Sequence, residues 1–355
     1  MSETLAYIDG RPIGPGHPPY VVAEMSGNPN GDIQRALDLI SAAAGAGADA
    51  VKIQTYTADT ITLDHDGPGF RISGGLWDGR RLHELYAEAH TPWDWHARMF
   101  DHARAEGITL FSSPFDATAV DLLERLGAPA YKIASFELVD LPLIRRCAAT
   151  GKPLVMSTGM AAPEEIAEAV EAARGAGARD LVVLHCTSAY PAPMSSMNLA
   201  TLPDMARRFG VLPGLSDHTL GTAASVAAVA LGAVFIEKHF TLSRAEGGVD
   251  SAFSLEPAEL AELVQSCRGA WEAMGRVAYG PGEAEAGNAG LRRSLYASAP
   301  VRKGEVFTAS NVRSVRPGHG LAPKHLDTVI GRRATRDIPF GEPMDWSMVE
   351  GGGPA

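Results

Sequence analysis

This 355-residue sequence has few cysteines, no long apolar run and no signal-like first segment, and each absence excludes a class of protein. It contains three cysteines, Cys147, Cys186 and Cys267, whose spacing fits neither a metal site nor a disulfide framework. No stretch offers the roughly 18 uninterrupted apolar residues that a membrane helix needs. The first residues also lack the basic and apolar regions of a secretory signal. We therefore expect a soluble cytoplasmic protein that does not bind a membrane.

The sequence is also short of positive charge. Its formal net charge is −11, and the acidic residues are spread along the chain. Such a balance repels nucleic acid, so we expect no nucleic-acid partner. Any anionic ligand must then be held by a few cations concentrated in a pocket.

Short apolar runs alternate with longer segments of helical period between residues 19 and 274. This alternation predicts strand and helix units around a parallel sheet. The predicted strands are residues 21–25, 50–54, 109–113, 130–134, 154–157, 181–185, 211–215 and 234–237. Alanine-rich segments such as 33–44, 163–174 and 221–231 are the predicted helices. Eight units predict an α/β fold of the (β/α)8 or TIM-barrel type, in which catalytic side chains lie at the C-terminal ends of the strands.

Polar side chains stand at the C-terminal end of every predicted strand. They are Glu24, Lys52, Gln54, Ser113, Lys132, Ser135, Ser157, His185, Ser216, His218, Glu237 and His239. A single lysine in a strand is usually an edge residue that faces solvent. Lys52 and Lys132, however, stand inside apolar runs that the barrel and its helices should cover on both faces. Because an unpaired buried charge is costly, these two lysines favour a functional interpretation.

Two histidines twenty-one residues apart, His218 and His239, each directly follow a predicted strand. Neutral imidazole is the commonest nitrogen ligand of a divalent metal. One buried histidine after a strand is more often a hydrogen-bonded core residue, but two at neighbouring strand ends favour a metal site. We therefore predict that His218 and His239 bind a divalent metal.

The chain is predicted to hold two domains, a barrel over residues 1–279 and a small β-rich domain over residues 291–350. Residues 280–290 are the predicted linker, and the glycine-rich residues 351–355 are a predicted disordered tail. Residues 64–95 form an insertion after the second strand and are interpreted as a lid or substrate loop. Its tryptophans Trp77, Trp93 and Trp95 either anchor this loop or contact a sugar.

The strand-end motifs resemble those of the sialic acid synthase family, which condenses phosphoenolpyruvate with a sugar. The matching segments, in the family's order, are residues 23–26, 51–54, 112–115, 131–135, 157–160, 184–187, 214–219 and 237–241. Residues 313–318 and 331–334 look like the family's antifreeze-like or SAF domain. The resemblance therefore implies a TIM barrel followed by a small β-rich SAF domain.

One branch of the family is most similar to this sequence. Residues 76–79, 84–86, 91–96 and 248–254 resemble the pseudaminic acid synthases more than the synthases of N-acetylneuraminic or legionaminic acid. The resemblance implies a transferase that joins phosphoenolpyruvate to 2,4-diacetamido-2,4,6-trideoxy-altrose, adds water and releases phosphate. The product is a nonulosonic acid, a nine-carbon 2-keto sugar acid.

The resemblance also assigns residues to roles. Glu24 matches the family's proposed acid/base, although from the residues alone it is as well explained as a structural partner of a lysine. The metal on His218 and His239 is implied to be manganese, with magnesium or cobalt as alternatives. The phosphoenolpyruvate site is implied to comprise Lys52, Gln54, Ser113, Lys132, Ser135, Ser157, Ser188 and Ser216. The sugar site is implied to comprise Tyr190, Asp250 and Arg316.

Arg316 carries an implication about assembly. In the family a matching arginine reaches the sugar in the barrel of the other protomer, so the resemblance implies a domain-swapped homodimer. Arg313 is near enough in the sequence to compete for the same assignment. Two positions depart from the family: Pro29 stands where a histidine is common, and Ser188 stands where many relatives have asparagine.

Three hypotheses follow. The first is a pseudaminic-type synthase, and the second is a related synthase that takes another N-acyl sugar. The third is a non-catalytic barrel that serves as a binding scaffold. A scaffold has no need of a buried cluster that combines Glu24, Lys52 and Lys132 with the two histidines, so this set argues for an enzyme.

Overall fold

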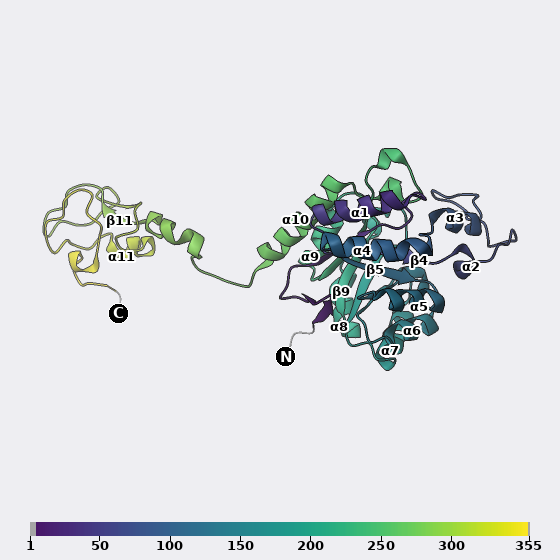
Figure 1. The fold of residues 1–355 in the computed structure, drawn as a ribbon. Coiled ribbons are helices and arrows are strands. Elements are labelled where there is room, and N and C mark those ends of the chain that lie inside the picture. The colour runs from purple at the N-terminus through teal and green to yellow at the C-terminus, as the bar shows by residue number, and fades with distance from the viewer. Residues whose placement is uncertain (1–4, 354–355) are drawn as a thin grey trace. The chain divides into compact units, whose positions relative to one another are not determined.

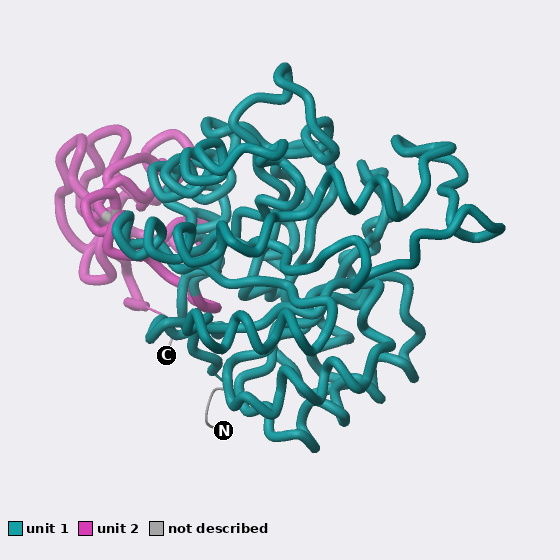
Figure 2. Tube along the Cα trace, turned by 45° about the vertical axis from the view of Figure 1, so that its right-hand side comes forward, with its two compact units in different colours: residues 1–275 teal, residues 276–355 magenta. Residues whose placement is uncertain are grey.

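The computed structural model describes residues 5–353 and divides into two compact units, Met1–Gly275 and Arg276–Ala355 (Figure 2). The first unit is a closed barrel of eight parallel strands (Figure 1). Its strands, in barrel order, are β10 (Phe235–His239), β3 (Tyr20–Glu24), β4 (Ala50–Thr55), β5 (Thr109–Pro114), β6 (Tyr131–Ile133), β7 (Leu154–Ser157), β8 (Leu181–Cys186) and β9 (Leu212–Asp217). The predicted barrel is confirmed, and β9 and β10 each end two residues later than expected.

Helices follow the barrel strands in sequence and surround the barrel (Figure 1). They are α1 (Ile33–Gly45), α4 (His96–Glu106), α5 (Ala117–Leu126), α6 (Leu141–Ala148), α7 (Pro163–Gly175), α8 (Thr201–Phe209), α9 (Ala223–Ala230) and α10 (Pro257–Met274). Their boundaries have local causes. The Asp116 carboxylate accepts a hydrogen bond from the Ala119 amide at the start of α5, and Gly127 ends that helix with a φ of 72°.

Two kinds of side chain fill the inside of the barrel. Alternate residues of a strand share one face, so each strand contributes one inward residue at every second position. Toward the N-terminal ends these residues are apolar and pack with the β1 (Ala6–Ile8) and β2 (Arg11–Ile13) hairpin. Along β10, for example, Phe235 belongs to this apolar layer, while Glu237 and His239 stand two and four residues further on. The polar site is therefore confined to the C-terminal half of the barrel.

The insertion between β4 and α4 contains two short helices, α2 (Ala58–Ile61) and α3 (Leu82–Ala89). Two of its tryptophans hold it in place through their indole N–H groups. Trp93 donates to the carbonyl oxygen of Tyr56 at 3.2 Å, and Trp77 donates to that of Val249 at 3.2 Å. Trp77 also lies against Tyr190, with 5.8 Å between the ring centroids. The insertion is thus fastened to the loops at the C-terminal end of the barrel.

The second unit is small and rich in β-type structure. Strands β11 (Ser294–Ala297) and β12 (Val312–Val315) pair antiparallel, and a short helix, α11 (Leu326–Val329), follows them. Its core includes Leu295, Phe307 and Ile338. A 3-10 helix covers Glu283–Leu291. It overlaps most of residues 280–290, the predicted linker.

The predicted disordered tail, residues 351–355, is described as far as Gly353, and residues 354–355 lie outside the described residues. Gly352 donates to the Val349 carbonyl at 3.0 Å and accepts from the Arg332 guanidinium at 2.8 Å. These bonds hold residues 351–353, because a glycine-rich segment is ordered when neighbouring groups satisfy its backbone. Across residues 5–353, no helix is long and apolar enough to cross a membrane.

Candidate active site

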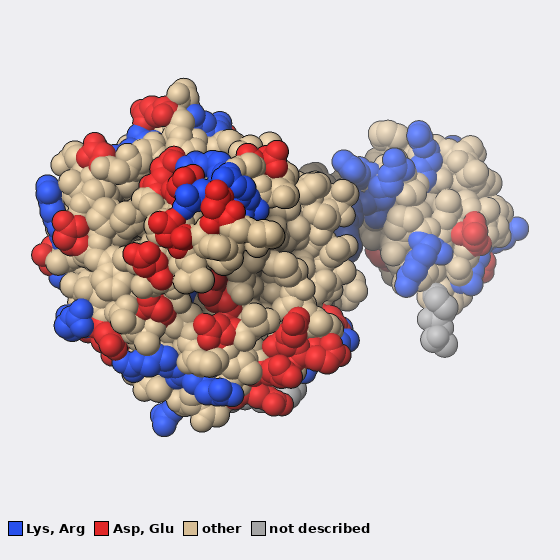
Figure 3. All heavy atoms as spheres, turned by 90° about the vertical axis from the view of Figure 1, so that its right-hand side faces the viewer, with Lys and Arg blue, Asp and Glu red and all other residues tan. Residues whose placement is uncertain are grey.

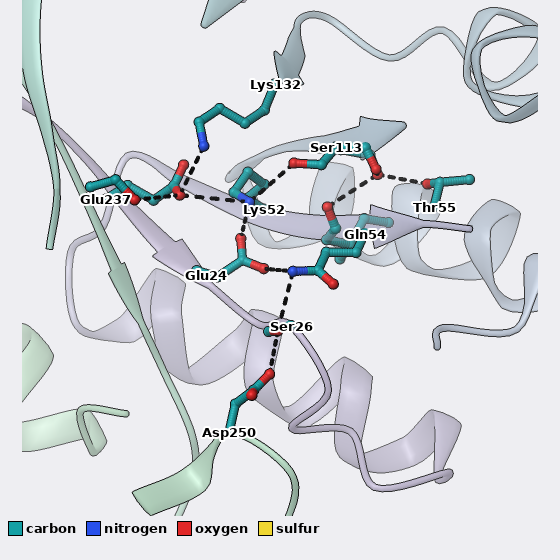
Figure 4. A network of polar contacts seen from close by, with 12 residues as sticks. Glu24, Ser26, Lys52, Gln54, Thr55, Ser113, Lys132, Glu237 and Asp250 are labelled. Atoms are coloured by element: carbon teal, nitrogen blue, oxygen red, sulfur yellow. Dashed lines mark hydrogen bonds and ion pairs between the residues drawn. The ribbon is translucent and has the colours of Figure 1, made fainter. Parts of the chain in front are cut away.

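Four buried charged side chains meet inside the C-terminal half of the barrel (Figure 4). The Lys52 ammonium lies 2.5 Å from Glu24 Oε2 and 3.6 Å from Glu237 Oε1, and it donates to the Ser113 hydroxyl at 3.2 Å. Lys132 donates to the same Glu237 oxygen at 3.2 Å. Two ammonium groups therefore face two carboxylates, and Glu237 is the counter-charge that both lysines share.

The surroundings separate the pKa values of the two carboxylic acids. Burial raises the pKa of Glu24, and the nearby Glu237 adds to the shift although Lys52 opposes it. Burial acts in the same direction on Glu237, but Lys132 and Lys52 outweigh it and lower its pKa. A pair of carboxyl groups with separated pKa values is the usual basis for an acid/base residue beside a permanently charged one. Glu24 is thus the group suited to exchanging a proton.

Each carboxylate oxygen of Glu24 has its own polar partner. The Gln54 amide donates to Glu24 Oε1 at 3.2 Å. Oε2 pairs with the Lys52 ammonium at 2.5 Å. Glu24 is therefore held between an amide donor and a cation.

A chain of hydrogen bonds leads from Glu24 to the loop after β10. The Gln54 amide, besides its bond to Glu24, donates to the Ser26 hydroxyl at 3.2 Å. Ser26 in turn donates to Asp250 Oδ2 at 2.5 Å, and the Gly27 amide donates to the same oxygen at 3.3 Å. Figure 4 shows the continuous path from Asp250 to Glu24 and on to Lys52. The sequence-predicted residues Glu24, Gln54 and Asp250 are therefore joined through Ser26.

The predicted serines line the same region. Ser135 and Ser188 hydrogen-bond through their hydroxyls at 2.8 Å, and Gly159 lies so close that a Cβ there would come within 2.7 Å of the Ser135 Cβ. Ser216 donates to Glu237 Oε1 at 3.3 Å. Ser157 is buried, and its hydroxyl lacks a hydrogen-bond partner within residues 5–353. Ser113 and Ser216 therefore contact the charged cluster directly, while Ser135 and Ser188 bond each other.

The histidine pair fits a metal with an incomplete protein ligand set. Their rings lie 5.2 Å apart, and His218 Nδ1 donates to the Thr187 carbonyl at 3.0 Å, which leaves the lone pair on Nε2. Burial is the main cause that holds the pKa of His239 well below its usual range, so its ring is neutral. His239 Nδ1 is buried and unpartnered in the part of the chain described.

The part of the chain that the structure describes adds no third ligand to the histidine pair. Among residues 5–353 no group of three or more His, Cys, Asp or Glu side chains is arranged to hold a metal. A divalent ion on His218 and His239 would complete its shell with water and substrate oxygens, which is the open arrangement of catalytic rather than structural sites.

A cavity of about 400 Å³ lies above the charged cluster. Ser26, Gln54, Tyr190, His239 and Asp250 form part of its polar wall. The opposite wall is apolar and comes from the insertion, with Ile61, Ile72, Trp77, Leu82, Leu85, Tyr86 and Ala89. The cavity thus offers polar groups for orientation beside a broad apolar surface, as small-molecule sites commonly do.

Residues on the outer face of the same strand ends form a separate ion pair. Lys238 donates to Asp217 Oδ2 at 2.8 Å and to the Thr219 carbonyl at 2.6 Å. Asp217 also accepts from the Thr219 amide and hydroxyl and from the Ser225 hydroxyl. Lys238 and Asp217 each precede one of the two histidines, so this pair fixes both strand ends from outside the barrel.

Most predicted site residues therefore converge on one cavity and the cluster beneath it. Arg316 is the exception, because it belongs to the second unit, where its side chain is exposed. His185 points away from the cluster and donates to the Met197 carbonyl at 2.6 Å. Sequence reasoning did not assign a role to Ser26 or Glu237. The position of Glu237, two residues before His239 on one strand, was the signal that could have identified it.

The fold and the site together define a (β/α)8-barrel protein with an enzyme-type cavity at the C-terminal ends of its strands. Residues 39–279 match the model of the NeuB family, and residues 292–350 match the SAF domain. The chain belongs to the NeuB family, and the predicted resemblance to the sialic acid synthases is confirmed.

Relatives and solved structures agree with this assignment. The chain is 46% identical to a pseudaminic acid synthase of Campylobacter jejuni over 92% of this chain and 95% of that protein. It is 36% identical to the N,N'-diacetyllegionaminic acid synthase of the same species over 91% of this chain and 97% of that protein. Among solved structures, an N-acetylneuraminic acid synthetase from Leptospira borgpetersenii in complex with citrate matches with a TM-score of 0.73 and 28% identity. That match covers 81% of this chain and 95% of that one.

Proposed function

We propose that this chain joins phosphoenolpyruvate to 2,4-diacetamido-2,4,6-trideoxy-altrose, as a pseudaminic acid synthase does. In this reaction C3 of phosphoenolpyruvate forms a bond to the aldehyde carbon of the sugar, and water adds at C2. Loss of inorganic phosphate then leaves the 2-keto acid. The identity to the Campylobacter enzyme supports this acceptor ahead of others.

One observation carries the proposal: two buried lysines stand beside serine hydroxyls. Lys52 and Lys132 provide two positive charges in a region from which water is largely excluded, where such charges bind anions strongly. Ser113, Ser135, Ser157, Ser188 and Ser216 are proposed to donate to the phosphate and carboxylate oxygens of phosphoenolpyruvate, with Gln54 at the edge of that site. The free hydroxyl of Ser157 supports this assignment.

Glu24 is proposed to carry the proton that moves when water adds. Burial raises its pKa toward the range that general acid/base catalysis requires, and Gln54 and Lys52 hold its two oxygens in place. Glu237 stays ionised under the same conditions because Lys132 and Lys52 lower its pKa. Its proposed role is to hold the two ammonium groups in place.

His218 and His239 are proposed to hold the metal. Manganese is proposed, with magnesium and cobalt as alternatives. When bound, a divalent metal supplies a Lewis acid that polarises a carbonyl oxygen. The neutral state of His239 and the hydrogen bond from His218 Nδ1 to the Thr187 carbonyl support this assignment.

The acceptor sugar is proposed to lie between the polar and apolar walls of the cavity. Tyr190 and Asp250 are available to orient its hydroxyl and amide groups. Ile61, Ile72 and Leu85 offer surface to the methyl groups of a 6-deoxy, diacetamido sugar, which carries more apolar surface than a fully hydroxylated one.

We also propose a homodimer in which Arg316 contacts the sugar bound by the partner protomer. Met160 and Leu220 support an assembly, because both are exposed in loops after the barrel strands. The three cysteines are unpaired, as is usual in a reducing compartment, and this supports a cytoplasmic location.

The test is phosphate release from phosphoenolpyruvate with manganese and a panel of acceptors. Release with the diacetamido-altrose sugar well above that with N-acetylmannosamine or the legionaminic acid precursor would support the proposed acceptor. Faster release with another N-acyl sugar would favour a related nonulosonic acid synthase. No release with any sugar from a folded, metal-loaded protein would contradict both enzymatic assignments and favour a scaffold.

A further inference from the structure

Ser26 has an unusual backbone conformation for its residue type. Four non-glycine residues between 5 and 353 have positive φ: Asp9, Ser26, Asn30 and Asn198. Aspartate and asparagine tolerate this left-handed region, whereas serine seldom adopts it. Ser26, with a φ of 47°, is also the buried member of the four. Strained residues of this kind persist where the surroundings hold them, and they concentrate at functional sites.

The partners of Ser26 fix the direction of each hydrogen bond around it. The Gln54 amide nitrogen can only donate to Ser26, and Asp250 Oδ2 already accepts from the Gly27 amide, so the Ser26 hydroxyl donates its single proton to Asp250 Oδ2, 2.5 Å away. The Ser26 oxygen is then left as an acceptor for Gln54, whose amide nitrogen lies 3.2 Å away. The second proton of that nitrogen points to Glu24 Oε1, also at 3.2 Å.

We propose that Ser26 is a positioning residue of the active site, which orients the Gln54 amide so that its N–H faces Glu24. This inference rests on the proposed function, in which Glu24 exchanges a proton. Without the Ser26 oxygen, the Gln54 amide loses one of its two acceptors and is free to rotate. Glu24 Oε1 then loses its donor, and the Lys52 ammonium at Oε2 is left to hold the carboxyl group.

The same chain links the acceptor side of the cavity to Glu24. Asp250 lines the cavity, and the hydrogen bonds from Ser26 and Gly27 occupy its Oδ2. Oδ1 accepts none of the hydrogen bonds found among residues 5–353, so it is available to a sugar hydroxyl. A sugar bound there holds Asp250 in the position from which Ser26 and Gln54 orient Glu24. The carboxylate that recognises the acceptor is thereby joined to the acid/base through two side chains.

A simpler explanation is that Ser26 is a small residue that fits a left-handed turn. Two substitutions separate the explanations. Ser26→Gly removes the hydroxyl but suits a positive φ, whereas Ser26→Ala removes the hydroxyl and keeps the backbone strain. Asp9→Ala is the matched control, because it puts alanine at a φ of 50° in the exposed turn of the β1–β2 hairpin, at the N-terminal end of the barrel.

The experiment measures kcat and both KM values for the metal-loaded, full-length enzyme, and solves crystal structures of the wild type and of S26G. We expect kcat to fall about 10- to 100-fold in both S26G and S26A, which is the scale of a misplaced catalytic group. The KM for phosphoenolpyruvate should stay within about twofold, because Lys52 and Lys132 are untouched, and D9A should keep the wild-type kcat. In the S26G crystal structure, Gln54 should have turned away from Glu24.

Wild-type kcat in S26G, or an unmoved Gln54 in its crystal structure, would overturn the inference. An equal loss of kcat in D9A would do the same, because backbone strain alone would then account for the effect. A different result would contradict the proposed function, namely that the wild-type protein releases no phosphate with any acceptor. In that case the position of Gln54 in the two crystal structures still decides the role of Ser26.

Discussion

The outward-facing pair of Lys238 and Asp217 leads to a quantitative prediction about stability. Both side chains are almost fully buried, and at 2.8 Å their attraction corresponds to about 6 kcal/mol at an effective dielectric constant of about 20. Removal of one partner of a buried pair costs about 3–5 kcal/mol, because the other charge remains buried. In Lys238→Met, Asp217 keeps three donors, the Thr219 amide, the Thr219 hydroxyl and the Ser225 hydroxyl. We therefore expect the low end of that range, about 3 kcal/mol.

The measurement is thermal unfolding by differential scanning calorimetry, following the transition of the barrel. For a domain of this size about 3 kcal/mol corresponds to a decrease in Tm of about 6 °C. Lys152→Met is the control, because Lys152 pairs with Glu124 at 2.6 Å on the surface, where such pairs contribute at most about 1 kcal/mol. The double variant Asp217→Asn/Lys238→Met should lose less than the sum of its two single variants. Additive losses, or a Tm for K238M equal to that of K152M, would refute this reasoning.

Three further predictions concern the active site and Glu137, which lines the cavity from the 3-10 helix Ser135–Glu137. Glu24→Gln should lower kcat by about 10²- to 10⁴-fold. Calorimetry should still detect phosphoenolpyruvate binding, because Lys52 and Lys132 remain. Unchanged turnover would exclude Glu24 as the acid/base. His218→Ala and His239→Ala should each abolish metal-dependent turnover, and unchanged activity in both variants would disprove the metal assignment. Burial raises the pKa of Glu137 from 4.5 to about 7, so its stabilising contribution is complete below about pH 4 and is lost as the pH rises through 7. Glu137→Gln should therefore raise Tm, relative to the wild type, more at pH 8 than at pH 5, and an equal difference at the two pH values would contradict this.

The barrel was predictable because strands buried on both faces appear as short apolar runs between helical segments. The alternation of residues along β4, for example, puts Ala50 in the apolar layer and Lys52 in the charged cluster. The ends of β9 and β10 were less predictable, since His239 is hydrogen-bonded within the sheet and polar residues carry little strand signal. The sequence therefore predicted which strands bear the site residues more accurately than it predicted the residue at which each strand ends.

The sequence predicted which residues belong to the site better than it predicted which of them contact each other. Lys52 and Lys132 stood out as charges in apolar runs, yet their shared partner Glu237 comes from a strand more than 100 residues beyond Lys132. Ser26 was equally hidden, because its role depends on a backbone φ and on a hydrogen bond to Asp250, 224 residues away. Such contacts follow from closure of the barrel, which brings β10 next to β3 and which no local pattern encodes.

Barrel closure also explains why residues 216–218 and 237–239 each combine side chains that face the cavity with one that faces outward. In the run from Ser216 to His218, Ser216 points inward and bonds Glu237, while Asp217 points outward and bonds Lys238. The run from Glu237 to His239 has the same alternation, with Glu237 inside and Lys238 outside. Because β9 and β10 are neighbours, the inner residues meet around the cavity and the outer ones meet in a buried ion pair. We therefore expect a change at either outer position to displace the histidine that follows it and so to affect turnover without a direct contact to the cavity.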